Sequence, residues 1–302
     1  MESQPRIVVD VALDRGLVSE LIGRRGQTVC IVIDILRATS TLCALLDGGC
    51  SEVLIAESIA RARAARALDD RHLLAGEVRA VAPIGFDFGN SPVEMSQRDL
   101  RGRTVVFATT NGTGALEACA GSRAVYAGAF CNATAVCSRA VDDVSAGPAH
   151  RSSDEAHLDA SPSHATESAT ESTDAPPQTD ILIVCAGRGG APAYDDTICA
   201  GYLVQVIERV TRVAGYSLIL REGARIALRT AQGALRDCAI RDALEDSDAA
   251  RSVKRAGLDT DLDWCARVDS TEVVPAMAGF LHKTGLHVMV PATPKHENLT
   301  QQ

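Results

Sequence analysis

Short runs rich in apolar residues alternate with helical patterns along most of the chain. The apolar runs predict strands at seven places, residues 7–11, 28–33, 52–56, 72–75, 104–108, 124–127 and 180–185. Apolar positions spaced three and four apart predict helices between them, over 39–47, 58–68, 114–120, 129–141 and 195–213. The alternation predicts an α/β layered fold with a largely parallel or mixed sheet. Runs that are apolar throughout, such as 30–33, are typical of strands covered on both faces.

The last quarter of the chain carries a different pattern. The region after Glu222 is predicted to be mostly helical, with short β-like segments over 272–275 and 287–290.

Residues 145–179 interrupt the alternation. These 35 residues hold 11 Ser or Thr, six acids, one base and a single large aliphatic side chain, Leu158. Such a segment buries too little apolar surface to offset the entropy lost on ordering, so we predict a disordered acidic insertion in a surface loop. Three of the seven histidines lie in it, and a solvated linker is favoured over a metal-binding tract. The insertion separates two α/β halves, 1–144 and 180–302, which we expect to form one catalytic unit.

Charge and cysteine usage narrow the class of protein. The net charge of -9 argues against a protein that coats nucleic acid, although a few local arginines suffice for an anionic substrate. No apolar N-terminal segment or run of about 18 apolar residues is present, so we expect no signal peptide and no membrane span. The ten cysteines form no Cys-x-x-Cys pair, and several lie inside apolar runs (Cys30, Cys43, Cys185 and Cys199). Buried free thiols and a cytoplasmic location are therefore expected.

Polar residues follow four of the predicted strands. Ligands of open α/β sheets bind at the carboxyl ends of strands, so these segments are the candidates for chemistry. The segments are Asp34–Thr41, Gly76-Glu77 with the loop Gly85–Pro92, Thr109–Gly114, and Ala186–Gly190 with Asp195-Asp196. They share carboxylates, hydroxyls, arginines and glycines.

These residue types together favour metal-assisted phosphoryl chemistry. Converging carboxylates suit Mg²⁺, which prefers oxygen ligands, and arginines at helix starts suit phosphate. For Asp34 a plain helix cap with a surface ion pair is an equally weighted alternative. A zinc site is disfavoured because the four histidines outside the insertion show no ligand spacing. Cys185 is not a thiol-phosphatase nucleophile, because Ala191 stands where that chemistry needs an arginine.

In this order the motifs resemble the 2-phosphosulfolactate phosphatase family over about residues 5–280, apart from the insertion. The matching runs are Val32–Thr41, Gly76-Glu77, Gly85–Pro92, Thr109–Thr113, Cys185–Gly187, Asp195-Asp196 followed by Ala200-Gly201, Asp263–Ala266 and Val274-Pro275. The resemblance implies a three-layer α/β/α fold and a Mg²⁺-dependent phosphatase that converts 2-phospho-3-sulfolactate to 3-sulfolactate and phosphate. Two positions depart from the family: Val78 separates Glu77 from Arg79, and Asp248-Ala249 replaces the usual His-Gly after Ser247.

The expected site follows from these motifs. The catalytic candidates are Asp34, Arg37, Glu77 and Asp87. The metal candidates are Asp34, Glu77, Asp87 and Asp196. The substrate-binding candidates are Arg188, Asn90, Ser91, Thr109, Thr110, Asn111, Gly112 and Thr113.

Several alternatives remain open at this point. In the first, the protein is a phosphatase that acts on another small anionic phosphoester. In the second, it is a non-catalytic protein that binds a small anion on the same scaffold. Metal-activated water is favoured over a phosphoenzyme, because Leu36 stands where haloacid-dehalogenase-type phosphatases carry their second Asp. A homodimer is expected as the commonest assembly of soluble enzymes.

Overall fold

We describe the protein from a computed structural model, which covers residues 5–22, 25–146 and 179–292. Its strands are β1 (Arg6–Ala12), β2 (Val29–Ile33), β3 (Glu52–Ile55), β4 (Leu73–Gly76), β5 (Thr104–Ala108), β6 (Ala124–Ala127), β7 (Ile181–Cys185), β8 (Ser217–Leu220), β9 (Pro275–Leu281) and β10 (Leu286–Pro291). Its α-helices are α1 (Val18–Leu21), α2 (Ala38–Asp47), α3 (Ile59–Leu68), α4 (Pro92–Ser96), α5 (Gly112–Ala118), α6 (Ala133–Ser145), α7 (Tyr194–Val213), α8 (Glu222–Ala234), α9 (Ile240–Glu245), α10 (Asp248–Arg255) and α11 (Thr260–Cys265). Short 3₁₀ turns are η1 (Arg15–Leu17), η2 (Arg25–Gln27) and η3 (Phe130–Asn132).

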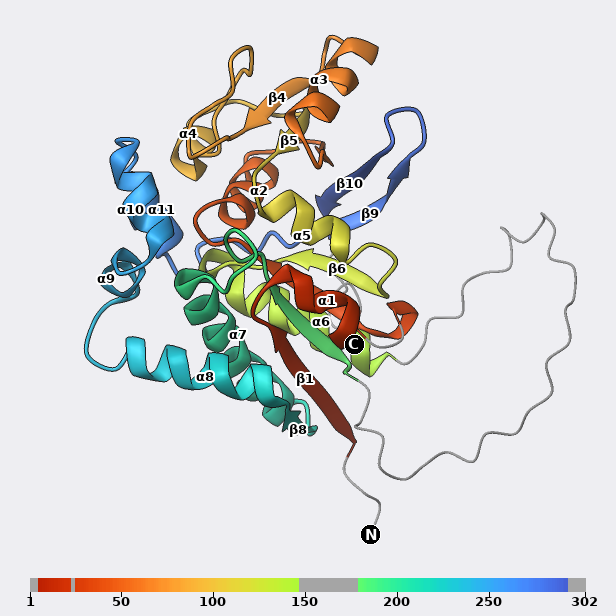
Figure 1. Ribbon diagram of the computed structural model, residues 1–302. Helices are drawn as coiled ribbons and strands as arrows, with labels where there is room; N and C mark the ends of the chain where they lie inside the picture. Colours follow the sequence, from red (N-terminus) through yellow and green to blue (C-terminus); the bar gives the residue numbers. More distant parts are fainter. Residues whose placement is uncertain (1–4, 23–24, 147–178, 293–302) are drawn as a thin grey trace, which may run out of the picture.

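All the described strands join one mixed sheet, in the order β4-β5-β3-β10-β9-β6-β2-β7-β1-β8. Helices flank this sheet, so the expected three-layer α/β/α class is confirmed (Figure 1). The central strands β2 and β7 are buried along their whole length, as their continuous apolar sequences predict. The long helix α7 packs against α8 and α6, and these helices also contact β1, β2 and β7.

The sheet consists of two parallel sets that run in opposite directions. One set is β4, β5 and β3, and the other is β6, β2, β7, β1 and β8. The hairpin of β9 and β10 lies between them and pairs antiparallel with each side. In Figure 1 the carboxyl ends of both sets point toward the middle of the molecule. This arrangement places strand-end loops from both halves around one region.

The C-terminal helices cover that region from the side. Helix α11 packs against α4 and α9, and α10 packs against α11 through the buried side chains of Ala250, Val253 and Leu262. Leu36, in the loop after β2, packs on the same cluster. Residues more than 200 positions apart in the sequence therefore share one packing unit next to the strand ends.

Most of the expected elements are confirmed, with boundaries shifted by at most four residues. Strand β8 and the short helices α1 and α4 were not predicted. Strand β8 is an edge strand whose four side chains are all only partly buried, and α4 has five residues, so neither carries a strong pattern. The β-like segment expected at 272–275 ends where β9 begins, because the exposed outer half of β9 shows no strand alternation.

The expected insertion falls mostly outside the described residues. Its flanks are described: Ser145 is the last residue of α6, and Thr179 is buried, where its carbonyl accepts a hydrogen bond from the Thr28 hydroxyl.

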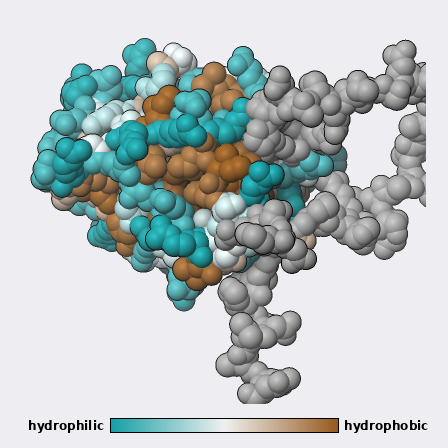
Figure 2. Space-filling view, turned by 90° about the horizontal axis from the view of Figure 1, so that it is seen from below, coloured by the Kyte–Doolittle hydropathy of each residue, from teal (hydrophilic) through white to brown (hydrophobic). Residues whose placement is uncertain are grey.

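The cysteine prediction is confirmed. All ten cysteines are free, and nine of them are buried, with Cys238 exposed. Within the described ranges no helix has the length and apolarity needed to cross a membrane. Seen from below, the surface gathers hydrophobic residues in the middle of the face and hydrophilic ones around them (Figure 2).

Candidate active site

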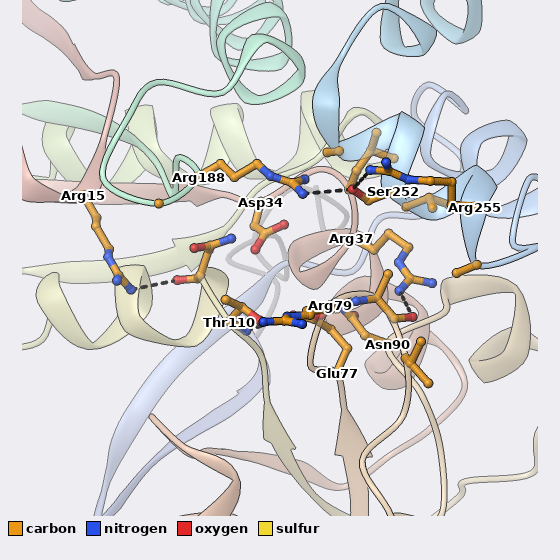
Figure 3. Close-up of a pocket in the computed structure, with 18 residues that line it drawn as sticks. Arg15, Asp34, Arg37, Glu77, Arg79, Asn90, Thr110, Arg188, Ser252 and Arg255 are labelled. Atoms are coloured by element: carbon orange, nitrogen blue, oxygen red, sulfur yellow. Dashed lines mark hydrogen bonds between the residues drawn. The ribbon is translucent and has the colours of Figure 1, made fainter.

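A cavity of about 690 Å³ lies where the two parallel sets meet. The loops after β1, β2, β4, β5 and β7 line it, together with one side of α10. Its charged lining residues are five arginines and two carboxylates, namely Arg15, Arg37, Arg79, Arg188, Arg255, Asp34 and Glu77. Figure 3 shows Asp34 near the centre, between Arg188, Ser252 and Arg255 on one side and Arg79, Glu77 and Thr110 on the other.

Asp34 follows the buried strand β2 directly. Its Oδ1 accepts a hydrogen bond from the amide of Ala38 at 3.3 Å, at the start of α2. The pKa of Asp34 is raised to about 6, mainly by burial and also by the negative charge of Glu77, while the hydrogen bond from Ala38 opposes the shift. Asp34 therefore bonds to the start of α2, as the helix-cap alternative expects, but Arg37 is the N-cap residue and, among the described residues, Asp34 forms no ion pair. The same carboxylate also faces the cavity.

Gly112, at the start of α5, permits a close approach to Asp34. A Cβ atom at this position would lie 2.7 Å from Asp34 Oδ2 and 2.5 Å from Ala38 Cβ. Any side chain would therefore push α5 away from the loop after β2. Gly112 does not line the cavity itself. Its role in the described structure is to bring the Thr110-Asn111 turn next to Asp34.

Glu77 joins two of the loops that line the cavity. Its Oε1 accepts the amide of Thr110 at 2.9 Å, and its Oε2 accepts the amide of Ala80 at 2.6 Å. Glu77 therefore connects the loop after β4 to the loop after β5. Each carboxylate oxygen keeps a second lone pair that can face the cavity.

The turn after Glu77 presents Arg79 to the cavity. Val78 and Val81 exchange two backbone hydrogen bonds, and the two residues between them have positive φ angles, 54° at Arg79 and 68° at Ala80. These are the angles of a type I′ turn, which favours glycine and is strained for other residues. The turn is held by Glu77 on one side and by Arg37, whose Nη2 donates to the Ala80 carbonyl at 3.0 Å. Strain of this kind is typical of functional sites.

A second turn of the same type lies on the opposite wall. Arg188 and Ala191 exchange two backbone hydrogen bonds around Gly189 and Gly190, whose φ angles are 60° and 78°. Here glycines occupy the positions that Arg79 and Ala80 fill in the first turn. Each turn carries an arginine into the cavity lining, one from each half of the sheet.

Arg37 is fixed by a buried ion pair. Its Nη1 lies 2.6 Å from Asp261 Oδ2, and the two side chains are 2% and 0% exposed. The hydroxyl of Ser91 donates to the other oxygen of Asp261 at 2.6 Å. Asp261 comes from α11, and Ser91 caps the N-terminus of α4. Ser91 therefore acts one step behind the cavity, which it does not line.

Asn90 is buried and lines the cavity. Its side-chain oxygen has no hydrogen-bond partner among the described residues. A buried polar atom without a partner costs free energy, so this amide is placed to bind a ligand.

The hydroxyls after β5 divide into two groups. Thr110 and Asn111 line the cavity. Thr109 and Thr113 are buried and bond to each other, with the Thr113 amide donating to Thr109 Oγ at 3.2 Å and the Thr113 hydroxyl donating to the Thr109 carbonyl at 3.0 Å. These two close the turn and do not line the cavity.

Two of the expected metal ligands lie elsewhere. Asp87 accepts the amide of Leu74 at 2.7 Å and pairs with Arg66, and it does not line the cavity. Asp196 is buried and does not line the cavity, and it accepts the amides of Ile35 at 2.9 Å and Gly187 at 3.1 Å. It therefore ties the loop after β2 to the loop after β7. Burial and the neighbouring charges of Asp195 and Asp34 raise the pKa of Asp196 well above its usual range.

A magnesium site remains compatible with the pair Asp34 and Glu77. Among the residues that the structure describes, no group of three or more His, Cys, Asp or Glu side chains is arranged to hold a metal. Mg²⁺, however, is commonly held by one or two carboxylates, with waters and a substrate phosphate as its other ligands. The donor set fits, because Glu77 is close enough to raise the pKa of Asp34 and a cation would relieve this repulsion.

Cys185 is removed from the cavity chemistry. It is the last residue of β7, is buried and does not line the cavity. Burial raises the pKa of its thiol, with Asp196 adding to the effect. A thiolate nucleophile at this position is disfavoured.

Sequence reasoning missed Arg15, Arg79, Ser252 and Arg255 in the cavity lining, and Asp261 behind it. Arg15 and Arg79 follow strand ends as Arg37 and Arg188 do, so the same rule could have found them. Helix α10 follows no strand, and no local pattern indicated its place. Of the two residues that replace the His-Gly pair of the family, Ala249 lines the cavity and Asp248 does not. Val78, the other departure, does not line it either.

The comparisons with known proteins agree with this geometry. The family model described as 2-phosphosulpholactate phosphatase matches residues 18–146 and 163–279. A protein of Deinococcus radiodurans named "Probable 2-phosphosulfolactate phosphatase" is 33% identical over 250 residues, covering 82% of this chain and 87% of its own length. Proteins of the same name from Thermus thermophilus and Symbiobacterium thermophilum are 32% and 31% identical, covering 83% and 85% of this chain and 88% and 92% of theirs. With its motifs in the same order and its strand-end residues gathered around one cavity, this chain belongs to the 2-phosphosulfolactate phosphatase family.

Proposed function

We propose that the protein is a Mg²⁺-dependent phosphatase that hydrolyses 2-phospho-3-sulfolactate to 3-sulfolactate and phosphate. The observation that carries the proposal is the charge of the cavity, where five arginines surround two carboxylates. The substrate has a phosphate, a carboxylate and a sulfonate, and such a ligand needs an excess of cationic donors. The names of the relatives support the same substrate.

The carboxylates form the reacting end of the cavity. Asp34 and Glu77 would hold the Mg²⁺ ion. When bound, this ion supplies charge neutralisation for the phosphate and lowers the pKa of water.

The arginines near Asp34 orient the phosphate. Arg37 is held by Asp261, so its guanidinium does not have to be ordered when substrate binds, and the strained turn places the backbone of Arg79 at the cavity. Asn90 supplies a polar group that has no partner among the described residues. The negative charge that develops on the phosphoryl oxygens is met by groups already in place, which is how enzymes obtain most of their electrostatic stabilisation.

The test is phosphate release by the purified full-length chain from a panel of substrates. The panel holds 2-phospho-3-sulfolactate, 2-phospholactate, glycerol 2-phosphate and p-nitrophenyl phosphate. We expect the highest kcat/KM with 2-phospho-3-sulfolactate. A higher value with another phosphoester would assign a different substrate, and no release from any compound would leave an anion-binding protein.

A further inference from the structure

Ser252 of α10 holds two arginines together at one wall of the cavity. Its hydroxyl accepts a hydrogen bond from Arg188 Nη2 at 2.9 Å and from Arg255 Nη2 at 3.3 Å. The same hydroxyl donates to the carbonyl of Asp248 at 3.1 Å, so its lone pairs face the guanidinium groups. The three residues come from two distant parts of the chain, the loop after β7 and the helix α10.

These two guanidinium groups share a neutral acceptor and lack a carboxylate. Across the described ranges, no Asp or Glu oxygen lies within 4.0 Å of either one. Asp248, on the same helix, is taken by Arg251. Two like charges held side by side repel each other, and an anion between them removes the repulsion and accepts hydrogen bonds from both. The wall is therefore built to receive an anionic group of a ligand.

This wall is distinct from the end of the cavity that carries Glu77 and Arg79. Figure 3 shows Asp34 between the two, with Arg188, Ser252 and Arg255 on one side and Arg79 and Glu77 on the other. A phosphate placed at Asp34 and Glu77 leaves this wall to a second anionic group of the same molecule.

We propose that Arg188 and Arg255, aligned by Ser252, form a second anion subsite that binds the sulfonate and selects for the substrate that carries it. The proposal rests on the function proposed above. A sulfonate remains ionised at any pH of interest and presents three acceptor oxygens. The two guanidinium groups can bind these oxygens because, in the described ranges, no carboxylate forms an ion pair with either of them. Arg255 and Ser252 are then specificity-determining residues.

The kinetic test compares two substrates in two variants. Arg255→Gln removes one guanidinium of the subsite, and Arg251→Gln is the matched control, because Arg251 is an exposed arginine of the same helix that does not line the cavity. We expect Arg255→Gln to lower kcat/KM for 2-phospho-3-sulfolactate about 10- to 100-fold, mostly through KM, as expected for the loss of a hydrogen bond between charged groups. For 2-phospholactate, which has a methyl group in place of the sulfomethyl group, the variant should stay within about twofold of wild type. Equal losses with both substrates would overturn the proposal.

Binding of product analogues separates this proposal from the proposed function. Calorimetry with 3-sulfolactate, malate and lactate measures the subsite without turnover, since malate carries a carboxylate where 3-sulfolactate carries the sulfonate. We expect Arg255→Gln to weaken 3-sulfolactate about tenfold or more, Ser252→Ala to weaken it less, and both to leave lactate unchanged. If the protein shows these binding changes but has no phosphatase activity, the anion subsite is supported and only the proposed function is wrong. The sulfonate assignment is contradicted if the enzyme is active but Arg255→Gln binds 3-sulfolactate as tightly as wild type does. It is also contradicted if Arg255→Gln weakens the binding of malate more than that of 3-sulfolactate.

Discussion

The buried pair of Arg37 and Asp261 gives a prediction whose size follows from the structure. The Asp261→Asn substitution keeps the shape but turns an amide nitrogen or a neutral oxygen toward Arg37 Nη1, which now lies 2.6 Å from a carboxylate. Arg37 is 2% exposed and would stay charged without a counter-ion. Removal of one partner from such a pair costs about 3–5 kcal/mol of stability. For a domain of this size, that corresponds to a fall in Tm of roughly 10 °C.

The assay is thermal and urea unfolding of Asp261→Asn beside Asp263→Asn. Asp263 is the matched control, because it is 60% exposed and pairs with Arg241 at the surface, where a salt bridge contributes about 1 kcal/mol or less. A double variant, Arg37→Met with Asp261→Leu, should regain much of the stability, since apolar residues can replace a buried ion pair, but it should not regain activity. Equal effects of Asp261→Asn and Asp263→Asn would refute the reasoning.

Three further predictions concern Asp34, Ala80 and Cys185. Asp34→Asn should lower turnover about 100-fold. In metal-free buffer the Asp34→Asn variant should also have a higher Tm than wild type above pH 6, and this difference should disappear toward pH 4. The reason is that the folded-state pKa of Asp34 is raised to about 6, so the wild type becomes less stable as the pH rises from about 4 to 6. A difference in Tm that does not depend on pH would contradict this prediction. Ala80→Gly should stabilise the fold by roughly 1 kcal/mol in urea unfolding, because glycine relieves the positive φ of 68°, and a loss of stability would argue against strain. Cys185→Ser should retain most of its phosphatase activity, because the thiol is buried away from the cavity, whereas an inactive but folded variant would point to a thiol nucleophile.

Local patterns were sufficient to predict the class of the fold and about half of the candidate site. The rule that ligands bind at the carboxyl ends of strands identified Asp34, Glu77 and Arg188, and all three line the cavity. The rule worked because each of these residues lies within three positions of the end of a strand whose apolar run is visible in the sequence.

The same local patterns could not separate Asp34 from Asp87. Both are carboxylates in polar loops, and the difference lies in their partners. Asp87 Oδ2 accepts the amide of Leu74 and pairs with Arg66, which stands 21 residues earlier, so only the folded chain shows that this carboxylate is bound away from the cavity.

The sequence also did not show that the two parallel sets of strands run in opposite directions. This arrangement depends on the β9–β10 hairpin, which inserts between β3 and β6 from the far end of the chain. Arg255 reaches the cavity for a similar reason, through the packing of α10 on Leu36 and α11 rather than through any local pattern.

The most direct test of the central claim is the Mg²⁺ dependence of phosphate release from 2-phospho-3-sulfolactate. The wild-type chain is measured after chelation and during titration with Mg²⁺, beside Glu77→Gln, which weakens the donor pair. We expect release to disappear on chelation, to return with Mg²⁺, and to need a several-fold higher Mg²⁺ concentration in Glu77→Gln. Full activity in the chelated wild type, or the same Mg²⁺ requirement in both proteins, would contradict a cation held by Asp34 and Glu77.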